Sequence, residues 1–211
     1  GLIKSPGNTI SVTGSTRETI SSDQIRWNAS FSREVPVANL KAGYEMIKKD
    51  QSEVLAYMVE QSIATSDVVF STVALEKPYE YNQNLPKNYI LRQNVLIRSN
   101  DVEKVTGLAQ NVQRLIDRGV VFSSSPLEYY YSELPRLRVS LLPAAIKDAK
   151  SRAEIIAKSS GRRLGYVQSV NMGPVQVLAI NSTGVSDYGN YDTSSKEKEV
   201  MVAVNAVFRL Q

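Results

Sequence analysis

The sequence predicts an α+β fold in which mostly antiparallel sheets are covered on one face by long helices. Three segments carry apolar residues at helical spacing, and several others alternate apolar with polar residues, as half-buried strands do. Between residues 25 and 132 these elements follow in the order strand, helix, strand, strand, helix, strand. This is the order of a split βαβ, or ferredoxin-like, core. The rest of the chain adds a further helix and C-terminal strands.

The first elements are two strands and a long helix. Residues 9–14 alternate and end at Gly14, and a second alternating strand begins after Asp23 and is closed by Pro36. A helix over 38–63 follows, because its apolar side chains share one stripe while lysines face water.

The next elements are two antiparallel strands, 67–77 and 88–98, followed by a helix over 101–118. Asn100 is the predicted N-cap of this helix, with Glu103 at the capping-box spacing. Gly119 ends the helix as a natural C′ residue. Residues 120–132 then return as a strand.

The third helix, over 141–160, has alanines every four residues, which therefore share one face. They are Ala145, Ala149, Ala153 and Ala157. This alanine ladder indicates close packing inside the molecule, with an oligomer seam as the alternative. Gly161 caps the helix, and Gly165 lets the backbone turn into a strand over 166–172.

The C-terminal part contains a short apolar stretch, a polar segment and a strand. Residues 181–197 have hardly any aliphatic side chain, so we expect an exposed loop that is functional or disordered. Residues 200–210 alternate and form a terminal strand. Residues 1–8 are expected to be a disordered or linker lead. Residues 9–211 then form one domain with sub-lobes 9–135 and 136–211.

The composition excludes most catalytic chemistry. The 211 residues include no Cys and no His, so thiolate nucleophiles, zinc fingers, iron–sulfur clusters and His-dependent triads are impossible. No nucleotide-binding glycine loop or EF-hand loop occurs. We therefore expect no enzyme activity, no cofactor and no metal.

The charge and hydropathy patterns bear on partners and location. The 25 basic and 21 acidic residues are mixed along the chain, so no nucleic-acid partner is expected. No apolar run is long enough to span a bilayer. The chain opens at Gly1 without Met, which is typical of an export product whose signal peptide has been removed, or of a trimmed chain.

Three stretches together resemble the SIMPL family, a family of unknown function. The first is Ile10-Ser-Val-Thr-Gly14 followed by Asp23, the second is Asp101 to Val105 leading to Gly119, and the third is the alanine-ladder helix with its glycine pair. Ser22 stands where the family usually has Pro. The residues carried over as structural motif positions are Val12, Gly14, Asp23, Gly119, Ala149, Ala153, Ala157, Gly161 and Gly165.

The resemblance implies function only broadly. Bacterial members are usually exported to the periplasm or cell envelope, some resemble subunits of ring-like oligomers, and some are linked to stress resistance. The leading hypothesis is thus a non-catalytic exported envelope protein that assembles with itself or binds an envelope partner. The alternatives are a binding module for a glycan or other envelope polymer and, as in an animal member, an intracellular signalling adaptor.

Several side chains are candidate ligand sites, and each also has a purely structural explanation. Tyr129 and Tyr131, with Tyr79, Tyr81, Tyr89 and Tyr130, form a tyrosine-rich set. Such rings can stack on a ligand, but tyrosine is also a common strand residue and strand structure is the favoured explanation.

Basic and acidic clusters are the other candidates. Arg162 and Arg163 suit an anion, although cations at a helix end also complement its dipole. Asp187 and Asp192 offer oxygen ligands without a recognised calcium spacing. Asp23 and Asp148 are the carboxylates on which a hydrolase would depend, but a turn former and a helix-surface charge explain them better.

Overall fold

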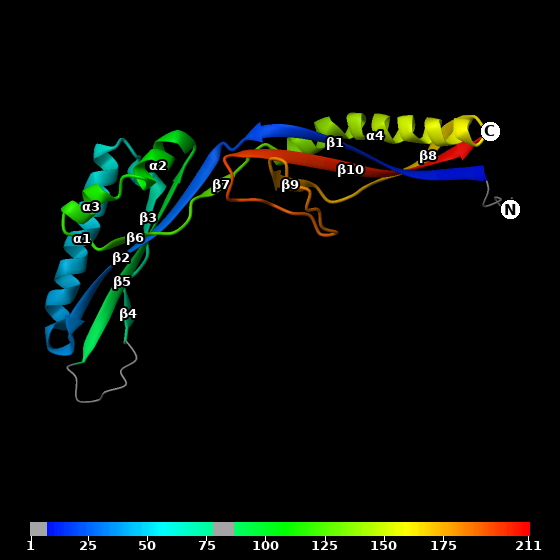
Figure 1. Cartoon of the computed structure of the whole chain (residues 1–211). Helices are drawn as coiled ribbons and strands as arrows, with labels where there is room; N and C mark the ends of the chain where they lie inside the picture. The colour runs from blue at the N-terminus through cyan, green and yellow to red at the C-terminus, as the bar shows by residue number, and fades with distance from the viewer. Residues whose placement is uncertain (1–7, 78–86) are drawn as a thin grey trace. The chain divides into compact units, whose positions relative to one another are not determined.

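The computed structural model describes residues 8–77 and 87–211 (Figure 1). They form two compact units. Asp23–Tyr130 make up the insert unit, and the described residues up to Ser22 together with Tyr131–Gln211 make up the terminal unit. This division differs from the expected sub-lobes, because the first strand pairs with the last one and so belongs with the C-terminal part of the chain.

The insert unit is an antiparallel sheet with helices. Its strands follow the order β3-β5-β2-β6, while β4 pairs with β5 and β7 pairs with β2. The strands are β2 (Gln24–Pro36), β3 (Val68–Phe70), β4 (Ala74–Glu76), β5 (Asn88–Ser99), β6 (Phe122–Ser124) and β7 (Glu128–Tyr130). The helices are α1 (Leu40–Glu60), α2 (Val102–Ala109) and α3 (Gln113–Asp117).

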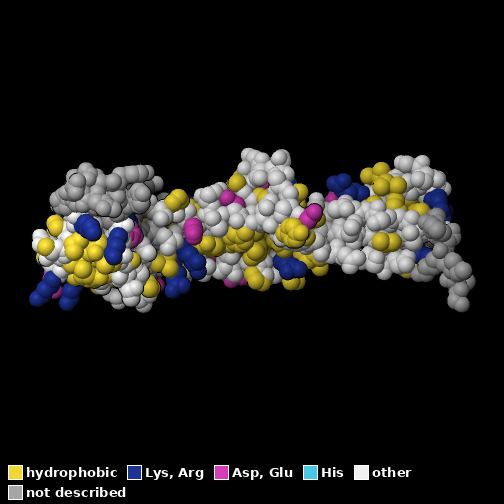
Figure 2. Space-filling model, turned by 90° about the horizontal axis from the view of Figure 1, so that it is seen from below, with side chains coloured by type: hydrophobic (Ala, Val, Ile, Leu, Met, Phe, Trp, Pro, Cys, Tyr) yellow, Lys and Arg dark blue, Asp and Glu magenta, His cyan; other side chains and the backbone are white. Residues whose placement is uncertain are grey.

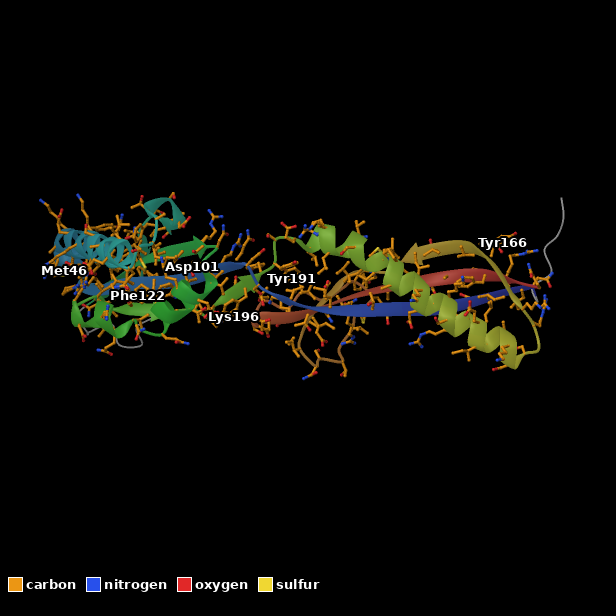
Figure 3. The ribbon with its side chains drawn as sticks, turned by 90° about the horizontal axis from the view of Figure 1, so that it is seen from above. Met46, Asp101, Phe122, Tyr166, Tyr191 and Lys196 are labelled. Carbon is orange, nitrogen blue, oxygen red and sulfur yellow. The ribbon has the colours of Figure 1, made fainter. Side chains whose placement is uncertain are left out.

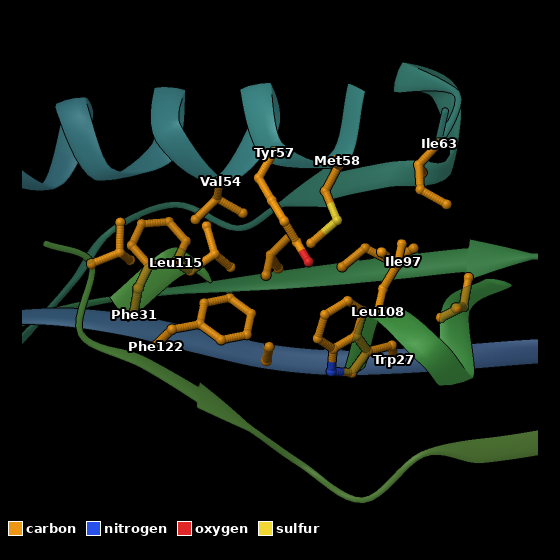
Figure 4. Packing of buried hydrophobic residues seen from close by; sticks show 14 of the residues in the cluster. Trp27, Phe31, Val54, Tyr57, Met58, Ile63, Ile97, Leu108, Leu115 and Phe122 are labelled. Carbon is orange, nitrogen blue, oxygen red and sulfur yellow. The ribbon is translucent and has the colours of Figure 1, made fainter. Parts of the chain in front are cut away.

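The predicted α+β class and the split βαβ order are confirmed. Strand β5 lies between β2 and β3 and is antiparallel to both, so the first two strands of the βαβ unit are separated by a third. The alternating residues of β2, among them Trp27 and Phe31, are fully buried against α1, which contributes Val54 and Met58 (Figure 4). The opposite face of β2 carries polar residues, which leaves this side of the sheet open to solvent.

Some predicted elements of the insert unit are broken. The segment 101–118 forms two short helices instead of one, and its N-cap is Asp101 rather than Asn100. The side chain of Asp101 accepts a hydrogen bond from the backbone N–H of Lys104, which is the role of an N-cap. Gly119 has a φ of 86°, which is the left-handed conformation expected after a helix.

The terminal unit is one helix on a sheet of order β1-β10-β8, with β9 also paired to β10. The long central strand β10 pairs antiparallel with both β1 and β8. The elements are β1 (Thr9–Ser21), α4 (Leu134–Ser159), β8 (Leu164–Met172), β9 (Gln176–Ala179) and β10 (Glu197–Leu210). Figure 1 shows α4 lying along β1 and β10.

The alanine ladder packs inside the terminal unit. Ala145, Ala149 and Ala153 are fully buried in a cluster with Val12 of β1 and with apolar residues of β10. Gly14 faces the backbone of Ala145 and Ala149, and there is no room there for even one Cβ atom. Small residues on both elements therefore allow the helix to approach the strand closely, and internal packing accounts for the ladder.

The polar segment 181–197 is tied to the sheet by a few buried polar side chains. Gln176, which is buried, donates to the backbone oxygen of Ser186 and accepts from the backbone N–H of Asn190. Lys198 is fully buried, and its Nζ donates to the backbone oxygen of Asp192 at 2.5 Å. Hydrogen bonds of buried polar side chains, rather than an apolar core, hold this segment against the sheet.

Candidate interaction sites

Strand β8 is an edge strand of the sheet in the terminal unit. The sheet order leaves β8 at one side, and none of the described strands pairs with its outer edge. Its nine residues include no charged side chain and no proline. Tyr166 is 66% exposed and Val167 44% exposed (Figure 3 labels Tyr166). Such an edge offers unpaired backbone groups to another strand.

The opposite edge strand, β1, is protected by charged groups. The backbone N–H of Ser15 donates to Oδ2 of Asp148 on α4 at 2.8 Å. This hydrogen bond, together with that from Arg152, lowers the pKa of Asp148 below its ordinary value of 3.8. Arg17 of the same strand forms an ion pair with Glu199. Charged groups at an edge discourage pairing with other strands, so the two edges differ.

A shallow groove lies beside α4 and β1. It has a volume of about 440 Å³ and is lined in part by Val12, Ile155 and Ile156. Ile155 is 67% exposed. On the face shown in Figure 2, apolar side chains gather in separate patches, with charged side chains of both signs around them.

A second pocket, of about 400 Å³, lies on the insert unit and contains Arg26, Arg98 and Tyr130. The guanidinium of Arg26 lies over the ring of Tyr130, 5.3 Å from its centroid. Sequence reasoning did not single out this pair of arginines. They are 72 residues apart and meet only through the pairing of β2 with β5.

The predicted tyrosine platform is divided by the fold. Tyr129 is buried in the core of the insert unit, and its hydroxyl lies 3.0 Å from that of Thr106. Tyr131 belongs to the terminal unit and packs against a small cluster of apolar residues there. Tyr130 alone of the three lines a pocket on the insert unit's surface. Tyr79 and Tyr81 lie outside the described residues.

The predicted basic pair lies where α4 ends. Gly161 follows the helix with a φ of 70°, and the backbone N–H of Arg162 donates to Ala157. Arg163 exchanges two backbone hydrogen bonds with Gln211. Gly165 lies against the backbone of Arg209, which explains the need for a small residue there.

Two of the acidic candidates, Asp148 and Asp192, accept hydrogen bonds through their carboxylates. Asp192 accepts from the hydroxyl and backbone of Ser194 and from Lys198. The backbone N–H of Asp23 donates to Tyr130 at 3.0 Å, where β2 begins. Over residues 8–77 and 87–211, no group of three or more carboxylates is arranged to hold a metal ion. Across the same ranges, no helix is long and apolar enough to cross a membrane.

The fold and these surfaces define an α+β protein with a ferredoxin-like insert unit, an unprotected edge strand and a pocket that contains two arginines. The chain belongs to the SIMPL family, whose model, described as a protein of unknown function (DUF541), matches residues 10–208. The resemblance based on three short stretches is thereby confirmed over nearly the whole chain. None of the curated proteins matches it.

Proposed function

We propose that this protein acts in the cell envelope, without catalysis, by assembling with a second copy of itself through the edge of β8. The observation that carries the proposal is the contrast between the two edge strands of the terminal unit. Strand β8 has exposed apolar side chains and no charge, whereas β1 has Arg17, Glu18 and the bond from Ser15 to Asp148.

The difference between the edges of β8 and β1 also determines the geometry of the contact between two copies. If the unprotected edge of β8 pairs with the same edge of a second copy, the two strands run antiparallel and the interface is two-fold symmetric. Such an interface closes after two copies. Pairing of β8 with β1 would instead build a ring or filament, but the charged groups along β1 oppose it.

Light scattering during size-exclusion chromatography tests the assembly. We expect the wild type to elute as a dimer and the double variant Tyr166→Lys/Ser169→Lys as a monomer, because lysines on an edge strand prevent pairing. The control is Thr19→Lys, which places a lysine at an exposed position of the other edge strand, β1, and should remain dimeric. A wild type that stays monomeric at millimolar concentration would contradict the proposal.

The envelope location is a separate proposal that rests on membership of the SIMPL family. Fractionation of cells expressing the natural full-length gene tests it. We expect the protein in the periplasmic or envelope fraction, and recovery in the cytoplasmic fraction alone would overturn this part.

A further inference from the structure

The open face of the insert unit places two arginines side by side. Arg26 of β2 and Arg98 of β5 are direct partners in the antiparallel register. Like charges at directly opposite positions destabilise a sheet. Both arginines line the same pocket of about 400 Å³, together with Gln24, Ser99 and Asn100.

Neither arginine has a carboxylate partner among the described residues. The side chain of Arg98 makes no hydrogen bond or ion pair with any of them, and the contact of the Arg26 guanidinium is with the face of the Tyr130 ring. Other arginines of the same unit are paired: Arg33 with Asp50, Arg92 with Glu76, and Arg118 with Glu60. The two positive charges in the pocket are thus available to a ligand.

Carboxylates lie near the pocket but do not neutralise these arginines by contact. Asp67 contributes to the wall. Glu128 lies opposite Arg26 in the register of β7, and it accepts a hydrogen bond from the hydroxyl of Tyr130 at 3.3 Å. Tyr130 thus contacts Glu128 through its hydroxyl and the guanidinium of Arg26 through its ring.

We propose that this pocket binds an anionic sugar, with its phosphate or carboxylate between Arg26 and Arg98. Guanidinium groups bind phosphate and carboxylate through paired hydrogen bonds. The side chains of Gln24, Ser99 and Asn100 offer the mixed donors and acceptors that sugar hydroxyls require. A pocket of this volume is in the range of small-molecule sites. The binding is independent of the pairing of β8, which belongs to the other unit.

Isothermal titration calorimetry with glucose 6-phosphate and glucuronate tests the site, with glucose and inorganic phosphate as comparison probes. We expect one of the two anionic sugars to bind the wild type and glucose not to bind. Arg98→Gln should weaken the binding at least tenfold, and Arg163→Gln, in the terminal unit, should leave it unchanged. Inorganic phosphate binding as tightly as either sugar would overturn the sugar part of the proposal, and no binding of any probe would overturn it all.

The stability of the free protein gives an independent measurement. Because the side chain of Arg98 is bonded to none of the described residues and faces a like charge, Arg98→Gln should raise the melting temperature without ligand. It should also abolish the rise that the sugar phosphate causes in the wild type. A fall in the melting temperature of the free variant would show that Arg98 has a structural role, and would contradict the proposal.

Discussion

Gly14 of β1 lies directly against the backbone of Ala149 in α4, so closely that a Cβ atom on Gly14 would overlap the backbone nitrogen of Ala149. The contact is between two backbones, and neither can move away by rotating a side chain. The glycine of the family motif and the alanine ladder are therefore two halves of one packing requirement.

Gly14→Ala should reduce the free energy of unfolding by at least about 2 kcal/mol, as expected for overpacking that the backbone must absorb. Urea denaturation followed by circular dichroism measures the change. Gly107→Ala is the matched control. Nothing lies within 4 Å of a Cβ placed there, and the residue lies within α2, so we expect a gain of about 0.5–1 kcal/mol. Equal effects at the two positions would contradict this account of Gly14.

Asp148→Asn should make the stability of the protein less sensitive to a fall in pH. The hydrogen bond from Ser15, and then that from Arg152, lowers the pKa of Asp148 in the folded protein. The stabilisation by these hydrogen bonds is therefore complete above pH 3.8, the ordinary pKa, and is lost as the pH falls through the folded pKa. We expect the variant to melt at a lower temperature than the wild type at pH 7. The difference should shrink below pH 3.8, and a difference that stays constant with pH would refute this role.

Lys198→Met should loosen the segment 181–197. The ammonium of Lys198 holds the backbone oxygen of Asp192, and its loss leaves that carbonyl without its donor, at a cost of about 1–3 kcal/mol. Hydrogen exchange should show faster exchange of the amides of Asn190 and Asp192, with little change in the insert unit. Protection that is unchanged in this segment would mean that Gln176 alone anchors it.

The same variant should show a different response to alkaline pH. Burial lowers the pKa of Lys198 despite the opposing charge of Asp192. Between the folded pKa and 10.5 the unfolded chain binds more protons than the folded chain, so the stability of the wild type rises with pH across this window. The melting temperature of Lys198→Met should rise less than that of the wild type over the same pH range.

Asp50→Ala should strongly destabilise the insert unit. Asp50 is buried and accepts two hydrogen bonds of 2.7 Å from Arg33. Only the carboxylate of this pair is buried, because the side chain of Arg33 is 30% exposed and also donates to the backbone oxygen of Gly119. We therefore expect a cost of about 1–3 kcal/mol for the lost charged hydrogen bonds. Arg136→Ala breaks an ion pair with Glu133 whose arginine is 80% exposed, and it should cost less than about 1 kcal/mol. Thermal denaturation of both variants measures the two losses of stability. Equal losses would mean that water replaces Asp50 as the partner of Arg33.

Local patterns predicted most of the elements, because their causes lie within a few residues of one another. The alternation around Trp27 predicts β2, and the four-residue spacing around Ala149 predicts the buried face of α4. The break between α2 and α3 was missed because the apolar stripe continues across it. The N-cap was misplaced by one residue because Asn100 and Asp101 are both good caps.

The candidate sites were harder to predict because they depend on register. Tyr129 and Tyr130 are neighbours in the sequence, but the strand directs one ring into the core and the other into a pocket. The pair of Arg26 and Arg98 exists only because β2 and β5 align those two positions. The order of the segment 181–197 depends on Gln176 and Lys198, which are polar residues that no hydropathy pattern assigns to the interior.

The pairing of β1 with β10 has a consequence for synthesis of the chain. Thr9 is opposite Arg209, so β1 leaves the ribosome about 200 residues before its partner, a delay of about 10–40 s at ordinary elongation rates. The insert unit draws its contacts from a continuous stretch of chain and can fold during that interval. The first strand must meanwhile stay unpaired, so the terminal unit can close only after the last strand has been made.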